Sequence, residues 1–169
     1  MTGLVYLIYF LTAILAQFLT GRGLVAAGNA TNLIASGCYA VLTVLFYSLF
    51  KPVNRWLSLL AALVSLGGCV VMTLAMFPRT ETPVSPLWFF GPYCLLIGYL
   101  VFKSTFLPRL LGVFMALAGV GWLAFLAPAI ARSLTPYIEG LGIFAEVSLM
   151  LWLIVKGVNV QRWNERAGA

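Results

Sequence analysis

Long apolar runs alternate with short polar or proline-containing segments along the whole chain. Dividing the chain at charges, prolines and glycines predicts six helices, at residues 3–20, 30–50, 55–77, 87–103, 109–131 and 137–157. Each is close to the roughly 17 to 25 residues with which a helix crosses a membrane. No connection is long enough to separate domains. The pattern therefore predicts an all-α membrane protein, a six-transmembrane-helix bundle formed by residues 1–157 as a single domain.

The basic residues predict how this bundle is oriented. Six spans place both termini on one side, which would then hold seven of the basic residues: Lys51, Arg55, Lys103, Arg109, Lys156, Arg162 and Arg166. The other side would hold three: Arg22, Arg79 and Arg132. Because basic residues favour the cytoplasmic side, both termini are expected to be cytoplasmic. The tail, residues 158–169, is too short and too charged to span and is expected to lie along the cytoplasmic surface.

Composition excludes a soluble protein. Hydrophobic residues make up 63% of the chain and charged residues 8%, whereas a soluble domain has about 25% charged residues. The net charge of +6 does not predict nucleic-acid binding, because the basic residues stand singly at the ends of apolar runs. The N-terminus lacks the basic segment and the clear cleavage site of a signal peptide, so residues 3–20 are expected to be a retained span.

The residue types present argue against a metal, a cofactor or a common catalytic triad. The chain has no His and no Asp, which removes the usual haem ligands, two-histidine metal sites and the Ser-His-Asp triad. Its three cysteines, Cys38, Cys69 and Cys94, lie singly within apolar runs and predict neither disulfides nor a zinc site. An enzyme is therefore less expected than a non-enzyme.

Small residues recur every four positions in three predicted helices. The series are Ala61, Ser65 and Cys69; Cys94 and Gly98; and Gly112 and Ala116. Such grooves let helix backbones approach closely in lipid. They are expected to close the bundle, with a homodimer face as the alternative.

Glu146 is a carboxyl group within the apolar run 139–157. If the last helix begins near Pro136, this side chain lies about 15 Å along it, near the midplane. Glu139 and Gly142 share its face, and Gly142 would leave space beside the carboxyl groups. A charged carboxylate there costs several kcal/mol, which favours protonation, pairing or a wet cavity. Glu146 is thus either a hydrogen-bonding link between helices or part of a proton, cation or ligand site.

Several other polar residues fall in the outer half of the predicted bundle. Asn29 also suits a helix N-cap, and Pro92 can kink the fourth helix next to Tyr93. We predict a polar cavity that opens outward and binds a ligand through Gln17, Arg22, Asn29, Asn32, Tyr93, Glu139 and Glu146.

Three segments carry a family resemblance: 51–55 (KPVNR), 98–112 (GYLVFKSTFLPRLLG) and 146–157 (EVSLMLWLIVKG). Together they resemble a bacterial family of small multi-span integral membrane proteins known only as a domain of unknown function. The resemblance implies a multi-pass protein of the bacterial cytoplasmic membrane and implies no activity. In that family the position of Tyr93 is often His, that of Ala145 often Gly and that of Asn29 often Asp.

Three classes of function follow. The favoured one is binding or sensing of a small lipophilic or weakly polar ligand, with Glu146 as its anchor in the outer cavity. The first alternative is a structural or accessory subunit of a larger membrane complex. The second is an intramembrane enzyme or transporter in which Glu146, with Tyr93, transfers protons. The lipid bilayer is the expected partner in all three, and nucleic acid in none.

Overall fold

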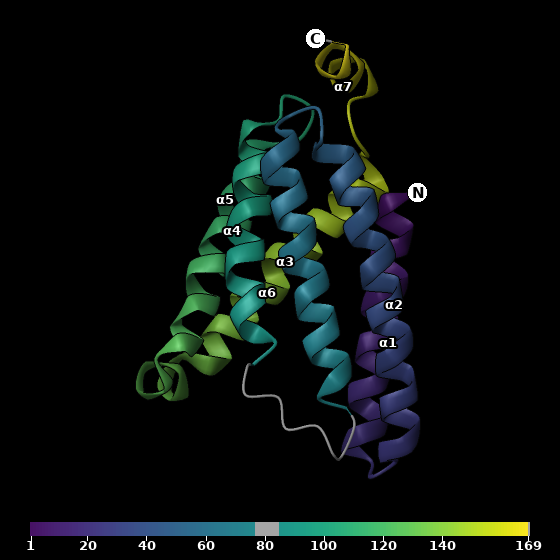
Figure 1. The fold of residues 1–169 in the computed structure, drawn as a ribbon, viewed down its shortest axis with the longest axis vertical. Coiled ribbons are helices and arrows are strands. Elements are labelled where there is room, and N and C mark those ends of the chain that lie inside the picture. The colour runs from purple at the N-terminus through teal and green to yellow at the C-terminus, as the bar shows by residue number, and fades with distance from the viewer. Residues whose placement is uncertain (77–84, 169) are drawn as a thin grey trace.

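Helices form the protein in the computed structural model, which describes residues 1–76 and 85–168 and, for residues 128–132, the backbone alone. In chain order they are α1 (Thr2–Gly21), α2 (Val25–Phe50), α3 (Arg55–Leu74), α4 (Leu87–Lys103), α5 (Arg109–Leu123), the short 3-10 helix η1 (Ala124–Leu126), α6 (Pro128–Val155) and α7 (Val160–Ala167) (Figure 1). The described residues contain no strand.

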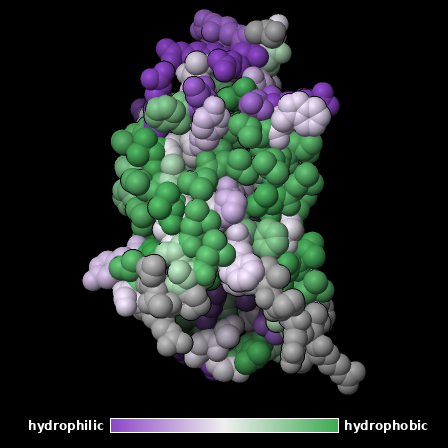
Figure 2. All heavy atoms as spheres, turned by 60° about the vertical axis from the view of Figure 1, so that its left-hand side comes forward, coloured by the Kyte–Doolittle hydropathy of each residue, from purple (hydrophilic) through white to green (hydrophobic). Residues whose placement is uncertain are grey.

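The long helices are apolar enough to lie in a membrane. Five segments are long and apolar enough to cross one: α1, α2, α3, Arg109–Leu126 and Ser133–Val155 of α6. The remaining long helix, α4, is equally apolar but is shorter, with 17 residues. Large apolar side chains are exposed on these helices, and hydrophobic residues form a broad band across the face that Figure 2 shows. The prediction of an all-helical membrane protein is confirmed, whereas six spans and the side of each terminus stay predictions.

The six long helices form a closed ring. Each packs against the next in chain order, and α6 packs against α1. At this last contact, a Cβ atom on Gly3 would lie 2.8 Å from the backbone nitrogen of Ile154. Only glycine permits such an approach at this position, so the first and last long helices meet backbone to backbone.

The closest packing joins α4 to α5. Two glycines on each helix, seven residues apart, face the other helix: Gly91, Gly98, Gly112 and Gly119. We call these four residues the glycine seam. A Cβ atom on Gly98 would lie 2.7 Å from the nitrogen of Ala116, and one on Gly112 would lie 2.6 Å from the Gly98 oxygen. The small-residue grooves predicted here thus act within the bundle, because backbones approach where side chains are absent.

The boundary between the fifth and sixth helices differs from the prediction. Helix α5 ends at Leu123 rather than at residue 131, and α6 begins at Pro128 rather than near residue 137. Proline is favoured in the first turn of a helix, and the residue before it is biased toward an extended backbone, as Ala127 is (φ −117°, ψ 91°). Pro136, predicted to start the helix, instead lies inside it. A membrane helix tolerates such a proline.

The first connection is shorter than predicted. Gly23 has a φ of +80°, a conformation that suits glycine, and it reverses the chain so that α2 begins at Val25 rather than at residue 30. Asn29 therefore lies inside α2 and is not its N-cap. Next to it, Gly28 packs against Thr20 of α1, which holds the two helices together as far as this turn.

Helix α7 covers one end of the bundle. Its Trp163 Nε1 donates a hydrogen bond to the Leu49 carbonyl of α2 (2.9 Å). Arg162 Nη1 donates to the Thr105 carbonyl between α4 and α5 (3.1 Å), and the Asn159 side chain caps the helix. We call this the α7 end. The start of α1 lies toward it (Figure 1), and hydrophilic residues gather there (Figure 2).

Candidate functional site

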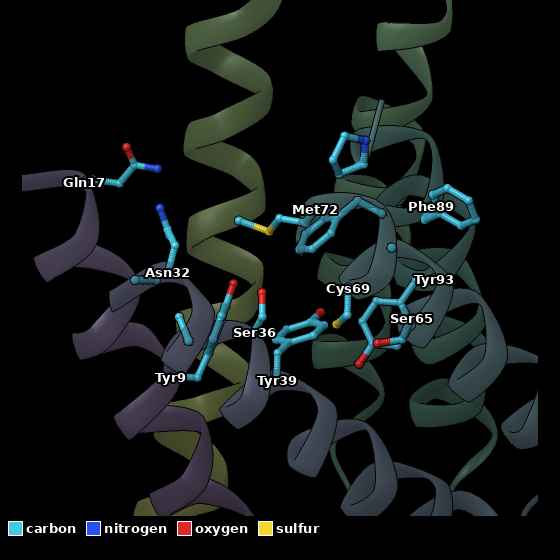
Figure 3. Close-up of a pocket in the computed structure, with 15 residues that line it drawn as sticks. Tyr9, Gln17, Asn32, Ser36, Tyr39, Ser65, Cys69, Met72, Phe89 and Tyr93 are labelled. Atoms are coloured by element: carbon cyan, nitrogen blue, oxygen red, sulfur yellow. The ribbon is translucent and has the colours of Figure 1, made fainter. Parts of the chain in front are cut away.

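A cavity of about 170 Å³ lies between α1, α2, α3 and α4. We call it the α1–α4 cavity (Figure 3). It is lined by Tyr9, Ala13, Gln17, Asn32, Ala35, Ser36, Tyr39, Ser65, Gly68, Cys69, Met72, Pro86, Phe89, Phe90 and Tyr93.

Helical periodicity places these residues. On α1, Tyr9, Ala13 and Gln17 recur every four residues and so share one face. Ala13 contributes only a methyl group to the wall, and Gly68 on α3 contributes no side chain, so space remains between the helices. Gln17 is exposed and lies with Asn32 at one end of the cavity (Figure 3). Two uncharged amides thus mark its mouth, toward the end of the bundle opposite α7.

The inner end of the cavity contains unpaired hydroxyl groups. Ser36 and Tyr39 are 8% and 7% exposed. No partner among the described residues lies at hydrogen-bonding geometry from Ser36 Oγ or from the Tyr39 hydroxyl, and the Tyr93 side chain is only a looser hydrogen-bonding neighbour of Tyr39. Ser36 and Tyr39 both lie beside Tyr9 (Figure 3). An unpaired buried polar group costs about 1–3 kcal/mol, and in native proteins such groups usually bond to protein or to ordered water. This end of the cavity can therefore accept a water molecule or a polar group of a ligand.

A neighbouring pair of hydroxyls is satisfied. Thr43 Oγ1 lies 2.9 Å from the Tyr39 carbonyl, to which it donates, and 2.6 Å from Ser65 Oγ. Because the only proton of Thr43 goes to that carbonyl, Ser65 is the donor in the second bond. This hydrogen bond links α2 to α3 next to the cavity. The hydroxyls of Ser36 and Tyr39 differ from this satisfied pair.

Aromatic rings form much of the cavity wall. The ring centroids of Tyr9 and Tyr39 are 4.7 Å apart, and Tyr39 is 6.0 Å from Tyr93 and 6.2 Å from Phe90. These rings come from α1, α2 and α4. Their mutual contacts fix the wall, because aromatic pairs at 4.5–7 Å attract one another.

Glu146 lies behind this aromatic wall and outside the cavity lining. It is 5% exposed, and its Oε1 has no hydrogen-bond partner among the described residues. The Tyr6 hydroxyl is the hydrogen-bonding neighbour of the carboxyl group. Tyr9, Tyr39 and Tyr93 lie within electrostatic reach of it. A buried carboxyl group is thus separated from the cavity by tyrosine side chains.

Three of the seven predicted site residues line the cavity: Gln17, Asn32 and Tyr93. The other four do not. Glu146 is buried outside the lining, and Asn29 is half-buried. Arg22 and Glu139 are exposed, with the Arg22 guanidinium 4.7 Å from the Phe18 ring centroid.

The space expected beside Gly142 is occupied. A Cβ atom at that position would lie 2.8 Å from the indole of Trp122, which stacks on Phe125 (5.6 Å) and meets Phe90 edge to face (5.3 Å). The glycine therefore accommodates an aromatic side chain of α5 and leaves no room for a ligand next to Glu146 on this side.

Several cavity residues were missed by the sequence analysis, chiefly Tyr9, Ser36 and Tyr39. Hydroxyl-bearing residues within apolar runs are common in membrane helices, and each alone is uninformative. Their spacing could have predicted a polar face. Asn32, Ser36 and Tyr39 are four and three residues apart and therefore share one face of α2.

The described residues contain no group of three or more His, Cys, Asp or Glu side chains that could hold a metal ion. All three cysteines are free thiols, and Cys69 lines the cavity.

Comparison with known proteins finds a partial family match. The chain is 28% identical over 123 residues to an uncharacterized protein of the archaeon Archaeoglobus fulgidus, a match that covers 68% of this chain and 74% of the relative. No solved structure matches. Because this relative is archaeal, the bacterial source stays a prediction. Residues 79–157, which include the motifs at 98–112 and 146–157, match the family described as "Domain of unknown function (DUF4386)", as the resemblance predicts.

Proposed function

We propose that the protein is a six-span membrane protein that binds a small, weakly polar molecule in the α1–α4 cavity. Helix α4, at about 26 Å, is long enough to serve as the remaining span. The α7 end contains seven exposed basic residues, whereas Arg22 is the one described basic side chain at the opposite end. This asymmetry supports cytoplasmic termini and a cavity mouth toward the outer face.

The observation that carries the proposal is the pair of unpaired hydroxyls at the inner end of the cavity. Ser36 Oγ and the Tyr39 hydroxyl can each donate and accept a hydrogen bond. A bound hydroxyl, carbonyl or amine group would satisfy them, and the apolar part of the ligand would lie against Ala13, Ala35 and Met72.

The cavity volume limits the ligand. An apolar cavity of about 150 Å³ holds a benzene molecule, so about 170 Å³ suits a molecule of roughly six to ten non-hydrogen atoms. Glu146 then acts behind the binding surface, through the tyrosines that separate it from the cavity, and not as the first contact of the ligand.

The test is native mass spectrometry of the full chain extracted gently from its own membrane. We expect a small-molecule mass at one per chain. The double variant Ser36→Ala, Tyr39→Phe keeps the cavity shape and removes both hydroxyls, and it should lose this mass. The matched control, Ser48→Ala with Tyr99→Phe, makes the same changes at positions outside the cavity lining and should retain it.

Two outcomes would contradict the proposal. Retention of the full small-molecule signal in the Ser36→Ala, Tyr39→Phe variant would show that the hydroxyls do not hold the ligand. Stoichiometric partner polypeptides, with no small-molecule mass, would instead favour an accessory subunit of a membrane complex.

A further inference from the structure

We propose that the α1–α4 cavity selects a small organic cation, of the alkylammonium class, over a neutral molecule of the same shape. The inference rests on the proposed function, because it names the class of ligand that the same cavity takes. Two features of the structure support it: the aromatic character of the cavity wall and a buried carboxyl group without a basic partner behind it.

Aromatic rings from three helices form the cavity wall. Five aromatic residues line the cavity: Tyr9, Tyr39, Phe89, Phe90 and Tyr93. Each ring carries negative potential on its face and attracts a cation placed within about 6 Å of the ring centroid. Groups of two or three such rings bind methylated ammonium ions in other proteins. Four of the five rings, those of Tyr9, Tyr39, Phe90 and Tyr93, contact one another at centroid distances of 4.7–6.4 Å, so they are positioned before any ligand arrives.

The buried charge has the complementary sign. The described lysines and arginines whose side chains are placed are all exposed, and none lies in the cavity lining. Glu146 is the one buried acidic side chain among the described residues. Electrostatic interactions weaken slowly with distance where no water screens them, so this carboxylate attracts a cation in the cavity, whose lining tyrosines Tyr9, Tyr39 and Tyr93 also lie within its electrostatic reach.

The groups around Glu146 do not supply a competing positive charge. The titratable groups within electrostatic reach of it are Tyr6 and Tyr9 of α1, Tyr39 of α2, and Tyr93 and Cys94 of α4. All are uncharged when protonated. A cation in the cavity therefore favours the ionised form of Glu146, and its binding releases a proton when the carboxyl group was protonated beforehand. It follows that affinity for the cation rises with pH, whereas affinity for a neutral ligand does not.

Two probes of matched shape test the inference. One is choline, and the other is its neutral carbon analogue, in which a tert-butyl group replaces the trimethylammonium group. Binding of both to the purified full chain in lipid nanodiscs is measured by calorimetry. We expect choline to bind about tenfold more tightly, within the range of a desolvated cation–π site.

The variant Glu146→Gln keeps the side-chain shape and removes the buried charge, so it should reduce the preference for choline to the part that the aromatic rings alone contribute; an undiminished preference would contradict the role of Glu146. The matched control is Glu139→Gln, an exposed carboxylate on the same helix, which should leave the preference unchanged. If Glu146→Gln does not fold, the wild-type preference measured over a pH series replaces it, and a preference that stays constant with pH contradicts the inference.

The outcomes separate the two proposals. Equal affinity for both probes overturns the selection of cations and leaves the cavity as a binding site for neutral molecules. Absence of binding by both probes, together with absence of any co-purified small molecule, overturns the proposed function as well.

Discussion

The glycine seam and the α1–α4 cavity show two ways in which small residues are used in one bundle. In the seam, α4 and α5 approach until a Cβ atom on Gly98, Gly112 or Gly119 would lie 2.6–2.8 Å from main-chain atoms of the other helix. In the cavity region, Gly67 and Gly68 of α3 face the side chain of Phe89, with Cβ distances of 3.1 Å. The Phe89 ring thus lies between α3 and α4, whereas no aromatic ring separates α4 from α5 at Gly98 and Gly112.

This difference shows that a small residue does not by itself determine how closely two helices pack. In lipid there is little hydrophobic gain from excluding tails, so packing contacts determine how closely helices approach. The identity of the opposing side chain then decides between a closed interface and a cavity. The three predictions below test this comparison, from the largest expected effect to the smallest.

Replacing a glycine by alanine should lower the stability of the protein in the seam and raise it at an open position outside the seam. Gly98→Ala places a Cβ atom 2.7 Å from the Ala116 nitrogen, and because backbone must move, we expect destabilisation of about 1–3 kcal/mol. The measurement is the apparent melting temperature in detergent.

The matched control is Gly37→Ala on α2, where no atom lies within 4 Å of the added carbon. It should stabilise the protein by about 0.5–1 kcal/mol, because alanine favours a helix more than glycine does. Equal melting temperatures for the two variants would show that the seam is not closely packed.

A larger side chain should be tolerated in the cavity and not at a fully buried position of α5. Ala13→Leu extends into empty space and should change stability by less than about 1.5 kcal/mol, while it removes the bound small molecule. Ala118→Leu makes the same change on α5 at a fully buried position and should destabilise by about 1–3 kcal/mol. Melting temperature and native mass spectrometry report the two effects. Retention of the small molecule by Ala13→Leu would place its site elsewhere.

Helix α7 lies outside both regions, bonded to Leu49 of α2 and to Thr105 between α4 and α5, and weakening its attachment should have the smallest effect on stability. Trp163→Phe removes the hydrogen bond to the Leu49 carbonyl, which contributes about 0.5–1.5 kcal/mol. We expect faster proteolysis of the tail with little change in melting temperature. Trp56→Phe, at a tryptophan that is 76% exposed, is the control. Identical proteolysis of the two variants would show that this bond does not hold α7.

The sequence predicts the helices better than it predicts the site, for a physical reason. Helix α4 has the predicted bounds 87–103, because Pro86 and Lys103 mark the ends of an apolar run. Pro128 and Pro136 could each begin α6, and local signals do not distinguish a starting proline from an internal one.

The cavity depends on which helix faces meet, and that is a property of the whole ring. Gln17, Asn32 and Tyr93 could be predicted because polar residues in apolar runs are conspicuous. The exposed position of Glu139 and the occupation of the space at Gly142 by Trp122 depend on how α6 is rotated against α5. No spacing within either helix determines that rotation.

The contact between Gly3 and Ile154 has a consequence for biosynthesis. A chain is synthesised from its N-terminus, yet the ring closes only when its first and last long helices meet. The hydrogen-bonding contact between Tyr6 and Glu146 therefore cannot form until nearly the whole chain has been synthesised. Helices α1 and α2 can pair early, because they pack extensively on each other.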